Sequence, residues 1–143
     1  MTLSGYFRSL ILAAAVAASA LPADAEAKYV FFFIGDGMGI GHVSTAETYN
    51  RTVLHSDKPL LMLTFPVASQ ARTYSASSPI TDSAAAGTAL SAGVKTNNAM
   101  VGMSPDTLDV ESIAARFMRS GRAVGVLTSV AGDDATPAAF YAH

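Results

Sequence analysis

A continuous apolar run at residues 29–34 is the feature that most constrains the fold. Its sequence, Tyr-Val-Phe-Phe-Phe-Ile, has no polar alternation, which suits a short strand buried on both faces in the centre of an α/β sheet. The run ends in a Gly-Asp-Gly-Met-Gly turn at residues 35–39, whose glycines tolerate positive φ. Residues 67–74 and 123–128 are predicted to be further short strands.

Helical signals alternate with these predicted strands. The expected helices cover residues 40–51, 81–92, 108–120 and the stretch that begins at 135. Thr81 or Asp82 is predicted to cap the second helix, and Gly93 to end it. In the third helix, apolar residues recur at helical spacing from Val110 to Met118. Alternation of strands and helices predicts an α/β fold, a sheet flanked by helices.

Residues 1–27 have the order of a secretory signal peptide. Arg8 gives a positive start, residues 10–21 are apolar, and small residues follow Pro22. Cleavage is expected after Ala25 or Ala27, so the mature chain starts near Lys28, and residues 28–143 are taken as the domain. The apolar run is shorter than the roughly 20 residues that span a bilayer, so no membrane anchor is expected. The protein is therefore predicted to be periplasmic or secreted.

Composition narrows the classes of function. Half of the 143 residues are apolar and 14% are charged, which fits a packed globular protein. A net charge of −2 supplies no basic surface for nucleic acid. The chain has no cysteine, so any metal site must use oxygen and nitrogen ligands.

Asp36 lies in the turn that follows the first predicted strand. In open α/β sheets ligands bind at this edge, and a carboxylate exposed there is an oxygen ligand suited to a hard cation. A dinucleotide-binding turn would need a glycine where Ile40 stands. A tight turn with a solvated aspartate remains an equal alternative on these residues alone.

Ser83 lies at the predicted start of the second helix, where free N–H groups and the helix dipole favour an anion. A serine hydroxyl is a weak nucleophile and needs a base or a metal to activate it. A serine-hydrolase elbow is not matched, because Thr81 and Ala85 occupy its glycine positions. The simpler alternative is a helix-capping serine without chemistry. The small residues at 84–87 leave room for a substrate and for close helix packing.

A third polar group follows the last predicted strand. Asp133, Asp134 and Thr136 offer oxygen ligands only, which suggests Mg²⁺ rather than zinc. The alternative is a helix start with Thr136 as the cap and Pro137 at the first helical position. A metal role and a cap are compatible.

These segments resemble the alkaline phosphatase family, in the same order along the chain. Residues 80–88, Ile-Thr-Asp-Ser-Ala-Ala-Ala-Gly-Thr, match its active-site signature. Residues 34–39 resemble its first metal segment and residues 134–139 the next. The resemblance covers essentially all of residues 28–143. It implies the N-terminal part of that family's catalytic domain, a three-layer α/β/α sandwich that is incomplete in this chain.

The resemblance also implies roles for individual residues. Ser83 is the nucleophile that becomes a phosphoserine, and it also binds one zinc. Asp36 bridges a zinc and the magnesium, Thr136 ligates the magnesium, and Asp134 bears on that site through water. Asp82 helps to orient a phosphate-clamping arginine that lies later in the family's sequence.

The implied activity is metal-dependent hydrolysis of phosphate monoesters, with zinc and magnesium as cofactors. Family members are commonly homodimers, which implies the same here. The remaining metal ligands come from later sequence in the family, so the chain is expected to be a fragment. The alternatives are an inactive secreted fragment and a phosphodiesterase of the same superfamily.

Overall fold

The computed structural model describes residues 27–142, so residues 1–26 of the predicted signal peptide lie outside it. The chain divides into two units, Met1–Ile34 and Gly35–His143. The described part of the first unit has neither helix nor strand. Its Phe31 and Phe33 rings stack with their centres 6.5 Å apart.

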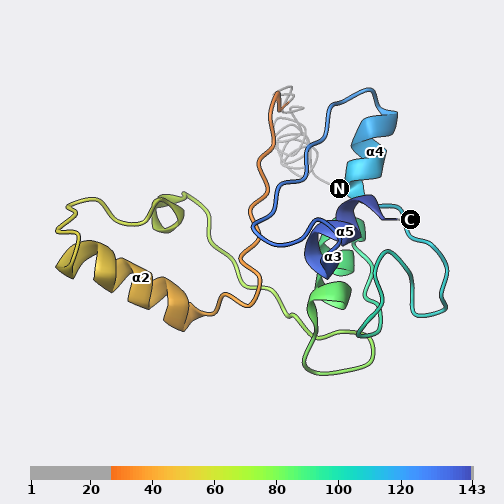
Figure 1. Cartoon of the computed structure of the whole chain (residues 1–143), viewed down its shortest axis with the longest axis horizontal. Coiled ribbons are helices and arrows are strands. Elements are labelled where there is room, and N and C mark those ends of the chain that lie inside the picture. Colours follow the sequence, from red (N-terminus) through yellow and green to blue (C-terminus); the bar gives the residue numbers. More distant parts are fainter. Residues whose placement is uncertain (1–26, 143) are drawn as a thin grey trace, which may run out of the picture. The chain divides into compact units, whose positions relative to one another are not determined.

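Three helices of the second unit pack against one another: α3 (Ser83–Ala92), α4 (Ile113–Arg119) and α5 (Ala135–Tyr141). Figure 1 shows their ribbons gathered together. Five alanines are buried in these helices, Ala84, Ala85, Ala114, Ala138 and Ala139, together with Pro137 and Gly87. Because alanine has so small a side chain, the helix backbones approach closely.

Helix α3 begins and ends where its local sequence predicts. Asp82 is the N-cap, and its Oδ1 accepts a hydrogen bond of 2.9 Å from the Ala85 N–H, which satisfies one of the unpaired donors of the first turn. Gly93 adopts a left-handed conformation with φ of 72° and donates its N–H to the Ala89 carbonyl. The hydrogen bond from the Ala85 N–H to Asp82 Oδ1 shows that the cap is Asp82 and not Thr81.

Helix α4 is shorter than the predicted helix at 108–120. Its N-cap is Ser112, whose hydroxyl accepts from the Ala115 N–H at 3.1 Å. The residues before it turn back on themselves, because the Ser104 N–H donates to the Leu108 carbonyl and the Val110 N–H to the Gly102 carbonyl. The helical spacing of apolar residues continues upstream of Ser112, but the Leu108 carbonyl, which a helix beginning there would use, instead accepts from the Ser104 N–H.

The predicted cap of α5 is wrong. Asp134 is the N-cap, and its Oδ1 accepts from the Ala135 N–H at 2.8 Å. Thr136 and Pro137 are therefore the second and third helical residues, not the cap and the first. The carboxylate takes the capping role and the Thr136 hydroxyl bonds elsewhere.

Helix α2 (Ile40–Thr52) confirms the helix predicted at 40–51, and a short 3-10 helix, η1 (Leu61–Thr64), follows it. Neither packs against α3, α4 or α5, and neither buries a residue. Glu47 joins α2 to the next loop, because its carboxylate accepts from the Leu60 N–H at 2.9 Å and from Arg51 Nε at 2.6 Å. Within residues 27–142 no helix is long and apolar enough to cross a membrane.

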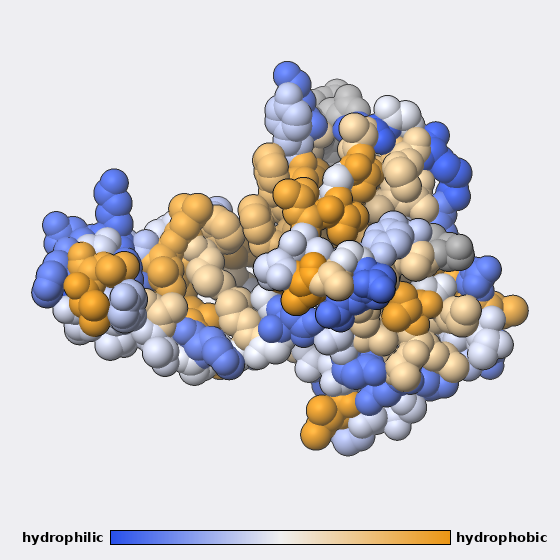
Figure 2. Space-filling view, viewed as in Figure 1, coloured by the Kyte–Doolittle hydropathy of each residue, from blue (hydrophilic) through white to orange (hydrophobic). Residues whose placement is uncertain are grey.

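The strands predicted at 29–34, 67–74 and 123–128 are not formed in the described residues. The β-pairing in the described residues is one isolated antiparallel bridge between Met103 and Asp109, outside these three segments. A strand exists only when its N–H and C=O groups pair with a neighbour, and these three segments have no ladder. Their apolar side chains stay at the surface, as the 84% exposure of Phe33 and 92% of Leu127 show. Figure 2 shows such apolar residues in orange at the molecular surface.

The contacts of Glu47 generate a pH-dependence prediction. The Leu60 N–H, and after it Arg51, hold the pKa of the Glu47 carboxyl below its ordinary value of 4.5. A depressed folded-state pKa stabilises the fold above the unfolded pKa, and this contribution is lost as the pH falls through the folded value. We expect the Leu60 amide NMR resonance to shift as the pH is lowered from about 6 to about 3.

In Glu47→Gln the Leu60 resonance should no longer follow this titration, because residue 47 cannot change its charge. Asp57→Asn, which removes an exposed carboxylate from the same loop, is the matched control and should titrate like the parent protein. If the Leu60 resonance of the parent protein does not shift with pH, the hydrogen bond from Leu60 to Glu47 does not control the pKa of Glu47.

Candidate active site

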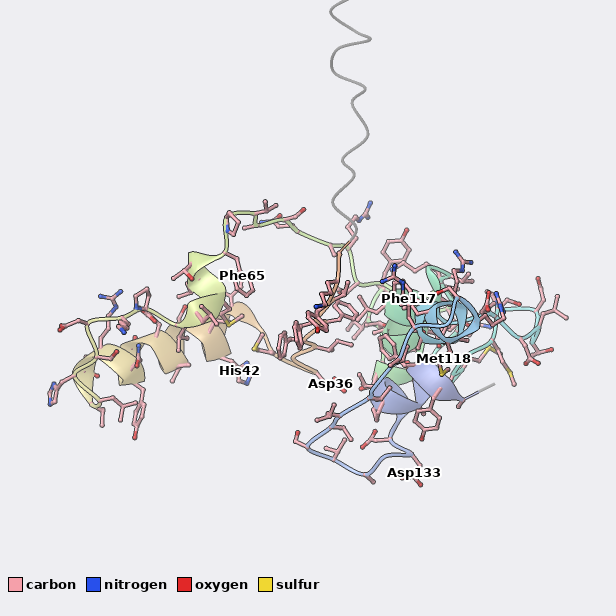
Figure 3. The ribbon with its side chains drawn as sticks, turned by 90° about the horizontal axis from the view of Figure 1, so that it is seen from above. Asp36, His42, Phe65, Phe117, Met118 and Asp133 are labelled. Atoms are coloured by element: carbon pink, nitrogen blue, oxygen red, sulfur yellow. The ribbon has the colours of Figure 1, made fainter. Side chains whose placement is uncertain are left out.

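The candidate site is built around Asp36, in the turn at residues 35–39. The Met38 N–H donates to the Gly35 carbonyl at 3.2 Å, which closes the turn. Gly37 has φ of 67°, a left-handed conformation that costs a residue with a Cβ about 1 kcal/mol or more. The turn leaves the Asp36 side chain exposed, as predicted. Figure 3 labels its position.

Two hydroxyl groups from distant parts of the sequence converge on this carboxylate. Ser83 Oγ lies 3.0 Å from Asp36 Oδ2 and 3.2 Å from Oδ1, and donates to them. Thr136 Oγ1 donates to Oδ2 at 2.7 Å. The structure thus brings together three residues that the sequence selected separately, from the turn, the start of α3 and the start of α5.

The chemistry of this group is that of hard oxygen donors. One carboxylate and two hydroxyls suit Mg²⁺ and similar cations better than soft metals. No cluster of three or more His, Cys, Asp or Glu side chains able to hold a metal occurs in the described residues. The four oxygen atoms of Asp36, Ser83 and Thr136 alone are therefore not a complete set of ligands for a cation.

Asp82 lies beside this group but does not join it. Its Oδ1 caps α3, and its Oδ2 accepts from the Ala99 N–H at 2.5 Å. The Asp82 N–H in turn donates to Asn98 Oδ1 at 3.4 Å. The predicted role of Asp82 toward a distant arginine stays a prediction.

Sequence analysis missed Asn98 and Ala99 as neighbours of the serine segment. They lie in a polar loop after α3. The signal in the sequence was the pair Asn97-Asn98, which is typical of a turn. The pair does not indicate which segment the turn would contact.

The other candidate residues lie around the convergent group. Asp134 is engaged as the cap of α5, and Asp133 is exposed in the loop before that helix. Figure 3 shows His42 near the start of α2 and apart from Asp36. His42 Nδ1 accepts from the Gly39 N–H at 3.2 Å, and His55 is exposed. Both histidines thus lie at the surface, as expected.

Thr88 and Gly87 hold α3 in place behind Ser83. The fully buried Thr88 donates through Oγ1 to the Ala84 carbonyl at 2.9 Å and accepts from the Gly102 N–H at 3.0 Å. Gly87 faces α5, where an added Cβ would lie 3.0 Å from Ala139 Cβ. The small residues at 84–87 thus serve the close helix packing that the sequence allowed.

A groove of about 730 Å³ runs along α2 and includes Leu54 and Leu60 in its walls. Asp36, Ser83 and Thr136 are not among its lining residues. This groove is therefore separate from the oxygen atoms gathered around Asp36, and its ionisable lining residues are His42 and Tyr49.

Comparison with known proteins identifies relatives of the chain. The model of the alkaline phosphatase family matches residues 27–143. The human tissue-nonspecific isozyme of alkaline phosphatase is 35% identical over 130 residues, which cover 82% of this chain and 25% of that protein. Alkaline phosphatase 4 of Drosophila melanogaster is 33% identical over 129 residues, covering 82% of this chain and 22% of that one. The chain spans about a quarter of the length of the curated relatives it matches.

Solved structures of alkaline phosphatases, which have an α/β fold, resemble the described chain. The Thermus thermophilus enzyme matches with a TM-score of 0.68 and 32% identity, over 76% of this chain and 23% of that one. The enzyme of the Antarctic bacterium TAB5 matches with a TM-score of 0.65 and 32% identity, over 77% and 30%. A variant of the TAB5 enzyme was solved with Mg bound.

The close contact between α3 and α5 at Gly87, beside the backbone of Thr136, can be tested by substitution. In Gly87→Ala the new methyl would lie 3.0 Å from Ala139 Cβ and 3.4 Å from Thr136 Cα. Overpacking of this kind costs about 1–3 kcal/mol, against a gain of about 1 kcal/mol in helix propensity. Adding Ala139→Gly removes the opposing methyl group.

We expect the double variant to be more stable than the sum of the two single changes by about 1 kcal/mol. Urea denaturation of the four proteins measures this coupling. Strictly additive free energies of unfolding would show that the two helices do not meet at this point.

Proposed function

Because this chain belongs to the alkaline phosphatase family, we propose that it supplies the nucleophile and part of the metal site for hydrolysis of phosphate monoesters. The observation that carries the proposal is the convergence of the Ser83 and Thr136 hydroxyls on the Asp36 carboxylate, at 2.7–3.2 Å. The alternative of a helix-capping serine does not explain this contact, because the cap of α3 is Asp82 and not Ser83.

Ser83 is the proposed nucleophile. It is the first residue of α3, where backbone N–H groups point out of the helix and the dipole favours a phosphoryl group. Its Oγ attacks phosphorus in line, a new Oγ–P bond forms, and the bond to the leaving alkoxide breaks. Water then cleaves the phosphoserine and releases inorganic phosphate, which restores the Ser83 hydroxyl.

Magnesium and zinc are the proposed cofactors. The carboxylate and hydroxyl set of Asp36 and Thr136 fits Mg²⁺, and Asp134, two residues before Thr136, is proposed to act on that ion through water. Asp36 and Ser83 are proposed to contribute to zinc sites whose other ligands are not among the described residues. When bound, such cations lower the pKa of a coordinated hydroxyl and neutralise charge on the transferred phosphoryl group.

Three further features belong to the same proposal. Family membership supports a three-layer α/β/α sandwich for the whole protein, in which segments 29–34 and 123–128 would find strand partners. The signal-like residues 1–27 support action in the periplasm or outside the cell. A homodimer is proposed from the family resemblance alone.

The nucleophile is tested by Ser83→Ala in the protein expressed from its complete gene. Removing Oγ leaves no atom to accept the phosphoryl group, so turnover of an aryl phosphate should fall by at least about 10³-fold. Ser91→Ala is the matched control, since Ser91 is also in α3 but its hydroxyl donates to the Thr88 carbonyl at 3.3 Å. Turnover by Ser83→Ala at the parent rate would sink the assignment.

The metal role of Thr136 is tested by Thr136→Val, which keeps the size of the side chain and removes Oγ1. We expect the Mg²⁺ concentration for half-maximal activity, and the dissociation constant from calorimetry, to rise about tenfold. Thr136→Ser retains the hydroxyl and should stay close to the parent protein. An unchanged Mg²⁺ affinity in Thr136→Val would remove this residue from the metal site.

A further inference from the structure

The side chain of Asn98 spans the two residues on either side of Thr81, immediately before Ser83. Its Nδ2 donates to the Ile80 carbonyl at 3.1 Å, and its Oδ1 accepts from the Asp82 N–H at 3.4 Å. A primary amide has one donor group and one acceptor, so a single side chain engages this backbone as a neighbouring strand would. The segment that leads into Ser83 has no strand partner in the described residues.

The next residue adds a second tie to the same segment. The Ala99 N–H donates to Asp82 Oδ2 at 2.5 Å. Ala99 has φ of 66°, a left-handed conformation that a residue with a Cβ adopts at a cost of order 1 kcal/mol. Such a conformation persists only where surrounding contacts hold it, and here the contact holds the cap of α3.

The loop that carries these two residues is itself anchored at both ends. The buried Thr96 accepts through its carbonyl from the Ala76 N–H at 2.8 Å. The Asn98 N–H donates to Ser77 Oγ at 3.0 Å. Farther along, the Gly102 N–H donates to Thr88 Oγ1. The loop at residues 96–102 is thus tied both to the segment before α3 and to the middle of that helix.

We propose that Asn98 is a positioning residue for Ser83. Resting on the proposed function, this inference assigns a role to a residue outside the group that converges on Asp36. The hydrogen bonds of Asn98 go to residues other than Asp36 and Ser83. By fixing the backbone at Ile80 and Asp82, it sets where the first residue of α3 lies, and hence where Oγ lies relative to Asp36.

The matched pair of variants is Asn98→Ala and Asn97→Ala. The two asparagines are adjacent, but the Asn97 side chain makes no hydrogen bond within residues 27–142, so its removal tests the loop without the clamp. Asn98 is exposed, and its truncation should leave the fold intact. Both variants are made in the protein expressed from its complete gene.

The first readout is hydrogen exchange of the amides in residues 80–85, which does not depend on activity. Asn98→Ala should speed exchange at Asp82 about fivefold, the effect of losing one net hydrogen bond, and Asn97→Ala should not. The second readout is turnover of an aryl phosphate. Misplacement of the nucleophile should lower kcat about 10-fold or more in Asn98→Ala and leave KM within about twofold.

Faster exchange together with a lower kcat supports the proposal. Unchanged exchange overturns it, and so does faster exchange with an unchanged kcat, because Ser83 would then not depend on the clamp. A parent protein without phosphatase activity would instead defeat the proposed function. In that case the exchange readout alone decides whether Asn98 holds the segment.

Discussion

The Asp36 carboxylate is the acceptor on which the arrangement of the site depends. It accepts hydrogen bonds from the hydroxyl groups of Ser83 and Thr136. These two residues lie 47 and 100 positions after Asp36 in the sequence. Each bond is exposed and contributes only about 1 kcal/mol, so Asp36 alone does not hold α3 and α5 together. The helices are placed by their own packing, and the carboxylate receives two donors that are already close. In the proposed cation site, such prior ordering of the side chains would lower the entropic cost of binding.

Helix α3 is the element that makes this prior ordering possible. Its N-terminus is capped by Asp82, its middle is tied to the following loop through the buried Thr88, and its face toward α5 is opened by Gly87. These contacts act on different parts of one helix. A change at any of them moves Ser83 or Thr136 without touching either side chain, so the site is sensitive to residues well behind it.

Features fixed by neighbouring residues could be predicted from the sequence, and those fixed by distant partners could not. The cap and glycine end of α3 follow from Asp82 and Gly93, and the structure confirms both. The prediction of Thr136 as the cap of α5 was wrong, because Asp134 is the cap and the Thr136 hydroxyl donates to Asp36, far away in sequence. The three strand predictions were wrong for the same reason, because the sequence of a segment does not say which other segment it pairs with. Asn98 was missed because its partners precede α3.

The starts of α3 and α5 share one device that explains why an acidic residue precedes each hydroxyl. Ser and Thr at a helix start readily bond to nearby backbone N–H groups, which would turn their hydroxyls away from a ligand. At both helices an aspartate takes the cap, Asp82 with Ala85 and Asp134 with Ala135. The Ser83 and Thr136 hydroxyls are thus not needed as caps, and both donate to Asp36. Asp134, which the sequence also offers to a metal, thus has a structural task as the cap of α5.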